Sequence, residues 1–197
     1  INGVAKWHSD ILVNDVFRDF YALYPDRFNN KTNGITQRRW LLYSNPELTN
    51  LLKDKIGDEF IYDFDKVEKL MDYVDDRDTQ ERFLAVKKQR KEILAAYIYK
   101  KTGIQVENNS IFDVHAKRLH AYKRQLLNVF NIIYLYQRIK SDPNFTMTPR
   151  TFIFAAKAAP AYTFAKNVIK LINVMSKVIN DDPDVRGMIK VVFIPNY

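Results

Sequence analysis

Two short, almost wholly apolar runs constrain the fold of this chain more than any other feature. RTFIFAA (150–156) and IKVVFI (189–194) lack the alternation of polar and apolar residues that a half-buried strand shows. Such runs are typical of parallel strands that are buried on both faces of a sheet. Between them, apolar residues recur at helical spacing in a segment that starts near Pro160. The two runs therefore predict a parallel sheet with a crossover helix.

One more strand and one more helix precede these runs. IFDVHAKRL (111–119) predicts a strand, and residues 122–140 carry apolar side chains around most of a helical circumference. The order strand, helix, strand, helix, strand over 111–197 predicts a Rossmann-like βαβαβ unit with right-handed crossovers. The predicted fold class is α/β, with a helical lead-in ahead of this unit.

The part of the chain before residue 110 predicts mainly helices joined by loops. The stretch 27–40 is rich in Asn and predicts an irregular loop with a tight turn at Asn33-Gly34. Gly57 and Gly103 are expected to end two of the helices. The expected N-caps and their helices are Ser9 for 10–23, Asn45 for 46–56, Asp65 for 66–75 and Asp78 for 79–101.

Composition limits the classes of function that the chain can have. It has 197 residues, of which 47% are hydrophobic, and this content can build a sizeable core and argues against global disorder. There are no cysteines, which excludes a disulfide scaffold and a Cys-based metal site. No apolar run approaches the roughly 20 residues that span a bilayer. The net charge of +8 is compatible with binding to phosphates, nucleic acid or anionic membranes.

Positive charge gathers where the first strand of the predicted sheet ends and its helix begins. Ligands of parallel sheets collect at the carboxyl ends of strands, and helix N-termini favour anions. Three interpretations stay open from these residues alone: a phosphate site, a solvated basic face, and a nucleic-acid surface. His120 has no second ligand nearby, so a hydrogen-bonding role is favoured over a metal. The basic residues fall within eight positions and are Lys117, Arg118, His120, Lys123 and Arg124.

Three further features carry alternatives. Tyr122 either packs or contacts a ligand, and Asn33 either hydrogen-bonds a sugar or serves a turn. The stretch AAKAAPAYTF (155–164) follows the second strand with small residues but lacks the GxGxxG pattern of dinucleotide sites. Tight packing between strand and helix is the favoured interpretation of this stretch.

Several stretches together resemble the α-glucan phosphorylases, the family of glycogen, starch and maltodextrin phosphorylases. The resemblance implies two Rossmann-like domains that face each other across a cleft, as in glycosyltransferases of the GT-B type. It implies that 1–37 form the end of the N-terminal domain and a cleft loop, that 38–110 form the helical lead-in of the C-terminal domain, and that 111–197 form its first βαβαβ. The matching stretches, in family order along the whole chain, are INGVAKWHS, RFNNKTNGITQRRWLL, NPELTNLL, FDVHAKRLHAYKRQLLN, PRTFIFAAKAAPAY and VVFIPNY.

The resemblance also implies a reaction and a cofactor. Inorganic phosphate would cleave the terminal α-1,4-glucosyl unit of a glucan and release glucose 1-phosphate. Pyridoxal phosphate would be the cofactor, with its own phosphate relaying protons and its aldehyde held as a Schiff base by a lysine outside this chain. The full-length enzyme is expected to be a cytoplasmic homodimer without membrane or specific nucleic-acid partners.

Individual residues take their expected roles from the same resemblance. Arg118 would bind the substrate phosphate, Lys123 would help to hold it, and Lys117 would contact the cofactor phosphate. Such a cationic site lets two phosphates approach each other, because like charges at ~4 Å repel by several kcal/mol at a dielectric near 20. The remaining assignments are Asn33 and Tyr122 to glucosyl hydroxyls, Trp40 to the cofactor pocket, Tyr197 to the cofactor phosphate, and Tyr162 to the mouth of the active site.

The sequence departs from the family pattern at a few positions. The usual GGKAAPGYH is AAKAAPAYT here, and Gln37 replaces a proline in a mild change. The added methyl groups narrow the mouth of the site, so inhibitor binding there is not carried over. We expect a central fragment of the enzyme that is inactive alone. A catalytically silent structural fragment and a basic nucleic-acid-binding domain are the alternatives.

Overall fold

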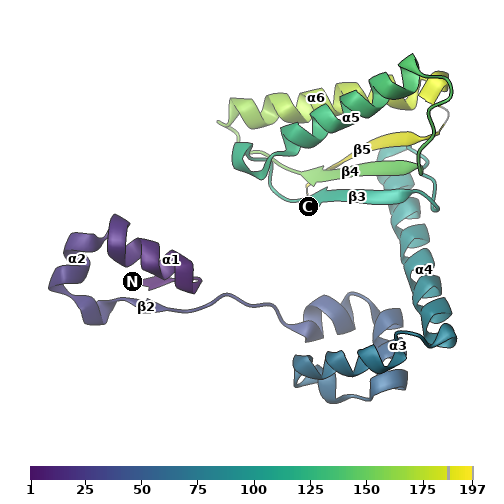
Figure 1. Ribbon diagram of the computed structural model, residues 1–197. Helices are drawn as coiled ribbons and strands as arrows, with labels where there is room; N and C mark the ends of the chain where they lie inside the picture. The colour runs from purple at the N-terminus through teal and green to yellow at the C-terminus, as the bar shows by residue number, and fades with distance from the viewer. Residues whose placement is uncertain (186, 197) are drawn as a thin grey trace. The chain divides into compact units, whose positions relative to one another are not determined.

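The structure is a computed structural model that describes residues 1–185 and 187–196. The chain forms two compact units, Ile1–Phe83 and Leu84–Tyr197, and helix α4 (Arg77–Thr102) runs through the division between them (Figure 1). No helix in the described ranges combines the length and the apolar character that a bilayer span requires.

The second unit is built on a three-stranded parallel sheet. Its strands β3 (Ile111–Ala116), β4 (Arg150–Ala156) and β5 (Ile189–Pro195) lie in that order. Ile111 is aligned with Arg150, which in turn is aligned with Ile189. The predictions of an α/β fold and of parallel strands at 150–156 and 189–194 are confirmed. The first strand is three residues shorter than the predicted 111–119.

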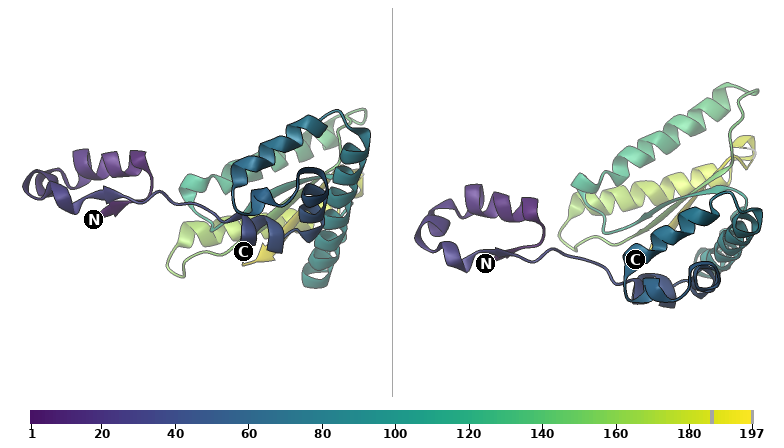
Figure 2. Two further views of the ribbon diagram at one scale, coloured as in Figure 1. Left: turned by 90° about the horizontal axis from the view of Figure 1, so that it is seen from below. Right: turned by 60° about the horizontal axis from the view of Figure 1, so that its bottom comes forward.

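Helices α5 (Gln125–Ser141) and α6 (Thr163–Asn180) cover one face of this sheet (Figure 1 and Figure 2). Phe152 and Phe154 of β4 are buried against them, whereas Ile153 points to the other face and packs with Ile98 of α4. The side chains of β4 thus enter two separate apolar layers. This explains why its sequence has no polar face.

Both helices begin later than predicted. Residues Ala121–Lys123 form a 3₁₀ turn, and Arg124 adopts the left-handed conformation with φ of 60°, so α5 starts at Gln125 and not at 122. Pro160 lies inside a turn in which the N–H of Tyr162 donates to the carbonyl of Ala159 (3.0 Å), so α6 starts only at Thr163.

The first unit opens with two short parallel strands and a series of helical turns. Strand β1 (Asn2–Gly3) pairs with β2 (Asn29–Asn30). The predicted helix over 10–23 is in fact three segments with a short 3₁₀ turn after them. They are α1 (Lys6–Ile11), a π-helix η1 (Leu12–Val16), α2 (Arg18–Leu23) and the turn η2 (Pro25–Arg27).

Two expectations for this region are wrong. Ser9 is not an N-cap: it lies inside α1, and its hydroxyl donates to the carbonyl of Ala5 (3.1 Å) and to Asn30 Oδ1 (2.7 Å). Asn33-Gly34 is not a tight turn, because the backbone of 31–36 is irregular and contains no defined turn. The N–H of Asn33 donates to the carbonyl of Val4 (2.9 Å), which keeps the chain alongside its N-terminal segment.

The remainder of the first unit packs around Leu52, Ile56 and Phe60. Asn45 is the N-cap of its helix as predicted, since its side chain accepts from the N–H of Leu48 at 3.2 Å. Gly57, with φ of 77°, ends that helix. The elements are the π-helix η3 (Arg38–Tyr43), α3 (Pro46–Ile56), and the 3₁₀ segments η4 (Glu59–Ile61) and η5 (Phe64–Tyr73).

Two predicted acidic caps are wrong. Asp63 and not Asp65 precedes the segment η5, which is 3₁₀ rather than α-helical. Asp76 and not Asp78 receives the N–H of Thr79 (3.1 Å) at the start of α4. Gly103, with φ of 72°, ends α4 as predicted.

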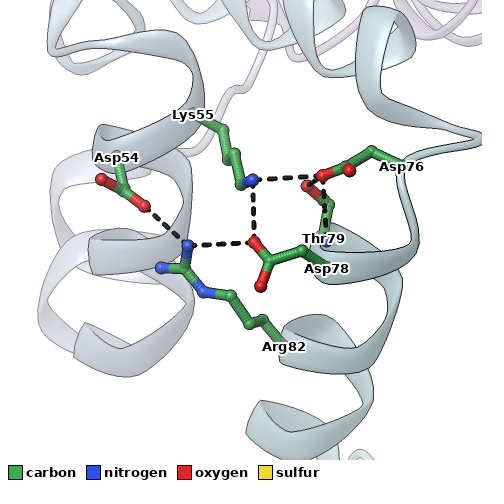
Figure 3. A network of polar contacts seen from close by, with 6 residues as sticks. All are labelled: Asp54, Lys55, Asp76, Asp78, Thr79 and Arg82. Carbon is green, nitrogen blue, oxygen red and sulfur yellow. Dashed lines mark hydrogen bonds and ion pairs between the residues drawn. The ribbon is translucent and has the colours of Figure 1, made fainter.

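Asp78, which does not cap α4, instead belongs to a network of charges between α3 and α4 (Figure 3). Lys55 contacts Asp76 (3.1 Å) and Asp78 (2.9 Å), and its side chain is only 16% exposed. Arg82 contacts Asp54 (2.6 Å) and Asp78 (3.6 Å). Each cation therefore has two carboxylate partners, and the network fixes the end of α3 against the first turns of α4.

Candidate functional site

The candidate site is built on the segment 117–124 between β3 and α5, which we call the basic loop. Its first residues continue along the end of the neighbouring strand. The N–H of Lys117 donates to the carbonyl of Ala155 (3.1 Å), and the N–H of Leu119 donates to the carbonyl of Lys157 (3.1 Å). Leu119 is 3% exposed and anchors the loop in the core. The basic loop therefore leaves the sheet at the carboxyl ends of β3 and β4, as predicted.

The second half of the basic loop turns back on itself. The N–H of Arg124 donates to the carbonyl of Ala121 (3.1 Å), and that of Lys123 donates to the carbonyl of His120 (3.1 Å). Left-handed backbone at a residue other than glycine costs roughly 1–2 kcal/mol. The fold retains this conformation at Arg124, and retained backbone strain is frequent at functional sites.

Two side chains from outside the loop hold it, and sequence reasoning missed both contacts. Gln125 Nε2 donates to the carbonyl of Arg118 at 2.9 Å. The hydroxyl of Tyr162 accepts from the N–H of Ala121 at 3.2 Å. Tyr162 stood out as an aromatic residue, but nothing in the sequence signals that its hydroxyl binds backbone. No pattern in the sequence indicated that Gln125 contacts the basic loop.

Two rings of the basic loop lie next to the ring of Tyr162. The ring of His120 lies 4.5 Å from that of Tyr122 and 5.1 Å from that of Tyr162, centroid to centroid. Tyr122 is 70% exposed, so its edge is open to a ligand. Within the described residues no three His, Asp or Glu side chains are grouped as metal ligands.

In the described part of the chain, the half-buried lysines of the basic loop differ from Lys55 in having no carboxylate partner, a feature they share with Lys91 and Lys190. Among the described residues, no carboxylate forms an ion pair with Lys117 or Lys123, both of which are half-buried. Lys123 Nζ lies 5.5 Å from the centroid of the Tyr122 ring. Lys55, by contrast, has two carboxylate partners. Partial burial of unpaired ammonium groups is unfavourable in the absence of an anion.

Lys123 also lines a hollow of about 360 Å³ beside α5, together with Arg124, Asp113 and His115. Burial, and secondarily the charge of Lys117, lowers the pKa of His115 from its usual value. His115 Nδ1 is buried and has no hydrogen-bond partner in the described part of the chain. Lys117 and Arg118 do not line this hollow.

The other predicted site residues belong to the first unit or lie outside the described residues. Asn33 is exposed and follows β2. Trp40 is 59% exposed in the π-helix η3, with the Arg39 guanidinium carbon 5.8 Å from its ring centroid. Tyr197 lies outside the described residues. The structure thus places Lys117, Arg118, Tyr122 and Lys123 on one loop, and Asn33 and Trp40 in the other unit.

The alanine-rich stretch after β4 has a structural role. Ala156 is 3% exposed and Ala165 is fully buried, and both belong to the core between the sheet and its helices. Ala158 and Tyr162 pack against the same core. Tight packing between strand and helix is therefore confirmed for only part of the stretch 155–164, because Ala159 and Ala161 are exposed.

Comparison with known proteins places the whole chain within one family. The family model for carbohydrate phosphorylase matches residues 1–197. Over all 197 residues the chain is 51% identical to glycogen phosphorylase of Bacillus subtilis and 47% identical to the muscle form from Oryctolagus cuniculus. It spans 25% and 23% of those two proteins, about a quarter of their length. The parallel α/β fold, the basic loop and these similarities agree, and the chain belongs to the carbohydrate phosphorylase family.

Proposed function

We propose that this chain is a segment of a glycogen phosphorylase, which transfers the terminal α-1,4-glucosyl unit of a glucan to inorganic phosphate. Family membership and relatives named glycogen phosphorylase support the proposal. The observation that carries it is the basic loop itself. Two half-buried lysines without ion-pair partners among the described residues lie on it, at the carboxyl ends of parallel strands. That is where an anionic ligand of such a sheet binds.

The basic loop supplies the electrostatic part of the proposed chemistry. Arg118 and Lys123 bind and orient the attacking inorganic phosphate, with the planar guanidinium able to bind two oxygens at once. Positive charge held beside the phosphate also stabilises the negative charge that shifts during glycosyl transfer. Tyr122 and Asn33 hydrogen-bond the hydroxyls of the glucosyl unit.

The donor set of the loop fits the phosphate of pyridoxal phosphate, because Lys117 is a half-buried ammonium without a carboxylate partner in the described residues. In the proposed enzyme Lys117 holds that phosphate, while Trp40 and Tyr197 line the cofactor pocket. When bound, the cofactor supplies a phosphate group that exchanges a proton with the substrate phosphate. We assign its Schiff-base lysine to a part of the polypeptide outside residues 1–197.

The proposal extends to the architecture and state of the full-length enzyme. Residues 111–197 form the first Rossmann-like βαβαβ of a C-terminal domain, 38–110 lead into it, and 1–37 end an N-terminal domain. The two domains face each other in a GT-B-like arrangement. The enzyme is a cytoplasmic homodimer that acts on α-1,4-glucan and inorganic phosphate.

Phosphorolysis by the full-length protein tests this function. The protein is incubated with maltodextrin, phosphate and pyridoxal phosphate, and glucose 1-phosphate is measured. We expect release that depends on both phosphate and cofactor. Release of free glucose without phosphate, or no turnover by cofactor-loaded folded protein, would contradict the proposal.

A further inference from the structure

Gln125 is buried in a way that the fold alone does not explain. It is the first residue of α5 and 1% exposed. Its Nε2 donates to the carbonyl of Arg118 at 2.9 Å. Its Oε1 is buried and accepts from no residue in the described ranges.

A buried acceptor without a partner destabilises the folded state. The other buried positions of α5, Val129, Ile132 and Ile139, carry apolar side chains that incur no such cost. A methionine at position 125 would fill a similar volume without a buried polar oxygen. Packing therefore does not account for the glutamine, whereas the hydrogen bond from its amide nitrogen to the basic loop does.

That hydrogen bond acts on one particular peptide group. The carbonyl of Arg118 and the N–H of Leu119 belong to the same planar unit. The N–H is held by the carbonyl of Lys157 at 3.1 Å, and the carbonyl is held by Gln125 at 2.9 Å. The N–H of Lys117, one residue earlier, is held by Ala155 (3.1 Å). The backbone on both sides of the Arg118 side chain is thus fixed, and Gln125 supplies the only one of these three contacts that comes from a side chain.

We propose that Gln125 is a positioning residue for phosphate binding, which acts by fixing the backbone orientation of Arg118. This inference rests on the proposed function, in which the Arg118 guanidinium binds the substrate phosphate. Without the amide donor, the peptide group between Arg118 and Leu119 is held at one end only. The guanidinium then samples more positions, and displacements near 1 Å in such a site cost about 10²-fold in rate.

The test uses the full-length enzyme and three variants. Gln125→Met keeps the length and removes the donor, and Gln125→Glu keeps the shape and replaces the amide donor by a carboxyl group. Gln137→Met is the matched control, because Gln137 lies exposed on the same helix. The measurements are KM for phosphate, KM for glucan, kcat, the melting temperature, and hydrogen exchange at the amide of Leu119.

For both Gln125 variants we expect KM for phosphate to rise about tenfold or more, since the guanidinium that binds the phosphate is no longer held in one position, with KM for glucan unchanged. Exchange at Leu119 should become faster. Gln125→Met should melt close to wild type because it also removes the unpaired oxygen, and Gln137→Met should match wild type throughout.

An unchanged KM for phosphate, or an unchanged exchange rate at Leu119, overturns the inference. A Gln125→Met protein that fails to fold or melts far below wild type also overturns it, since it assigns the residue a purely structural role. Absence of phosphorolysis in the wild type would instead refute the proposed function, so the two failures are distinct.

Discussion

The basic loop combines half-buried lysines that lack carboxylate partners among the described residues with a place at the carboxyl ends of two parallel strands. Lys140 contacts Asp182 at 3.1 Å and also pairs with Asp184, and these hydrogen bonds raise its pKa. Lys117 and Lys123 are half-buried, yet within the described ranges neither forms an ion pair with a carboxylate. A charged side chain that is neither fully solvated nor paired is more stable when an anion binds.

We expect Arg118→Ala in the full-length enzyme to reduce kcat/KM for phosphate by about 10²–10³, the usual effect of losing one donor to a transition-state oxyanion. Arg138→Ala is the control, because Arg138 is an exposed arginine on α5. Initial rates at varied phosphate give the comparison. Near-normal kinetics in Arg118→Ala would remove this residue from the phosphate site.

Gly3 offers a second prediction for a single residue. A Cβ atom there would lie 2.1 Å from Ser9 Oγ and 2.7 Å from the backbone N of Ser9. Because the second contact is to backbone, a rotamer change of Ser9 cannot relieve it. We expect Gly3→Ala to destabilise the first unit by about 1–3 kcal/mol, the typical cost of overpacking.

Gly34→Ala is the matched control, because a Cβ at Gly34 would meet no atom within 4 Å and the backbone there is not left-handed. Urea unfolding of the 197-residue chain, followed by the fluorescence of Trp7 and Trp40, which both lie in the first unit, measures both variants. Equal stabilities of the two variants would show that α1 does not pack as closely on β1 as the structure indicates.

At the scale of elements, the sequence predicted the strands of the three-stranded sheet better than the helix ends, and it did not predict β1 and β2. Strand β4 was predicted with its observed bounds because a strand buried on both faces needs apolar residues at every position. The start of α5 depends on the left-handed backbone of Arg124, and no residue type there signals it. Acidic caps were misassigned where several acids are adjacent, since only the packing of α3 decides that Asp76 caps α4 while Asp78 pairs with Lys55.

The same limit applies to the candidate site. Family resemblance and charge pointed to Lys117, Arg118 and Lys123, and these residues lie together on the basic loop. The contact of Gln125 with Arg118 spans seven residues and requires the intervening turn, so no pattern in the sequence predicts it. Sequence reasoning identified residues with conspicuous chemistry and missed those that act through backbone atoms.

The network between α3 and α4 predicts a dependence of stability on pH (Figure 3). Hydrogen bonds from the Thr79 hydroxyl and, to a smaller extent, from Lys55 lower the pKa of Asp76 to about 2. The usual value for an unfolded aspartate is about 3.9. The carboxylate therefore contributes stability that is fully present above pH ~4 and is lost as pH falls toward 2.

We expect Asp76→Asn, which keeps a capping side chain, to flatten the fall in unfolding free energy between about pH 4 and 2. Asp72→Asn is the control, because Asp72 is an exposed aspartate on η5. Urea unfolding at several pH values measures the effect. The same pH dependence in Asp76→Asn and wild type would contradict the assigned role.

At the scale of the whole molecule, the proposed function gives this chain one part of a site that needs several. It spans about a quarter of the length of its relatives and contains the basic loop. Phosphorolysis requires a glucosyl unit, an attacking phosphate and the cofactor phosphate to be held in register, and incomplete sites lose most of that positioning. We therefore expect the 197-residue chain alone to release no glucose 1-phosphate from maltodextrin, even with added phosphate and pyridoxal phosphate.

This last prediction separates binding from catalysis. If the basic loop forms as described, the isolated chain should still bind pyridoxal phosphate or inorganic phosphate weakly, and Lys117→Ala with Lys123→Ala should abolish that binding. Lys166→Ala with Lys170→Ala, at exposed positions of α6, is the control with the same loss of charge. Titration calorimetry at physiological salt distinguishes binding at the basic loop from binding that depends only on net charge. Binding that depends only on net charge would weaken equally in both double variants. Turnover by the isolated chain near that of the full-length enzyme, or a Schiff-base absorption band that survives dialysis, would place the catalytic lysine and a complete site within these residues.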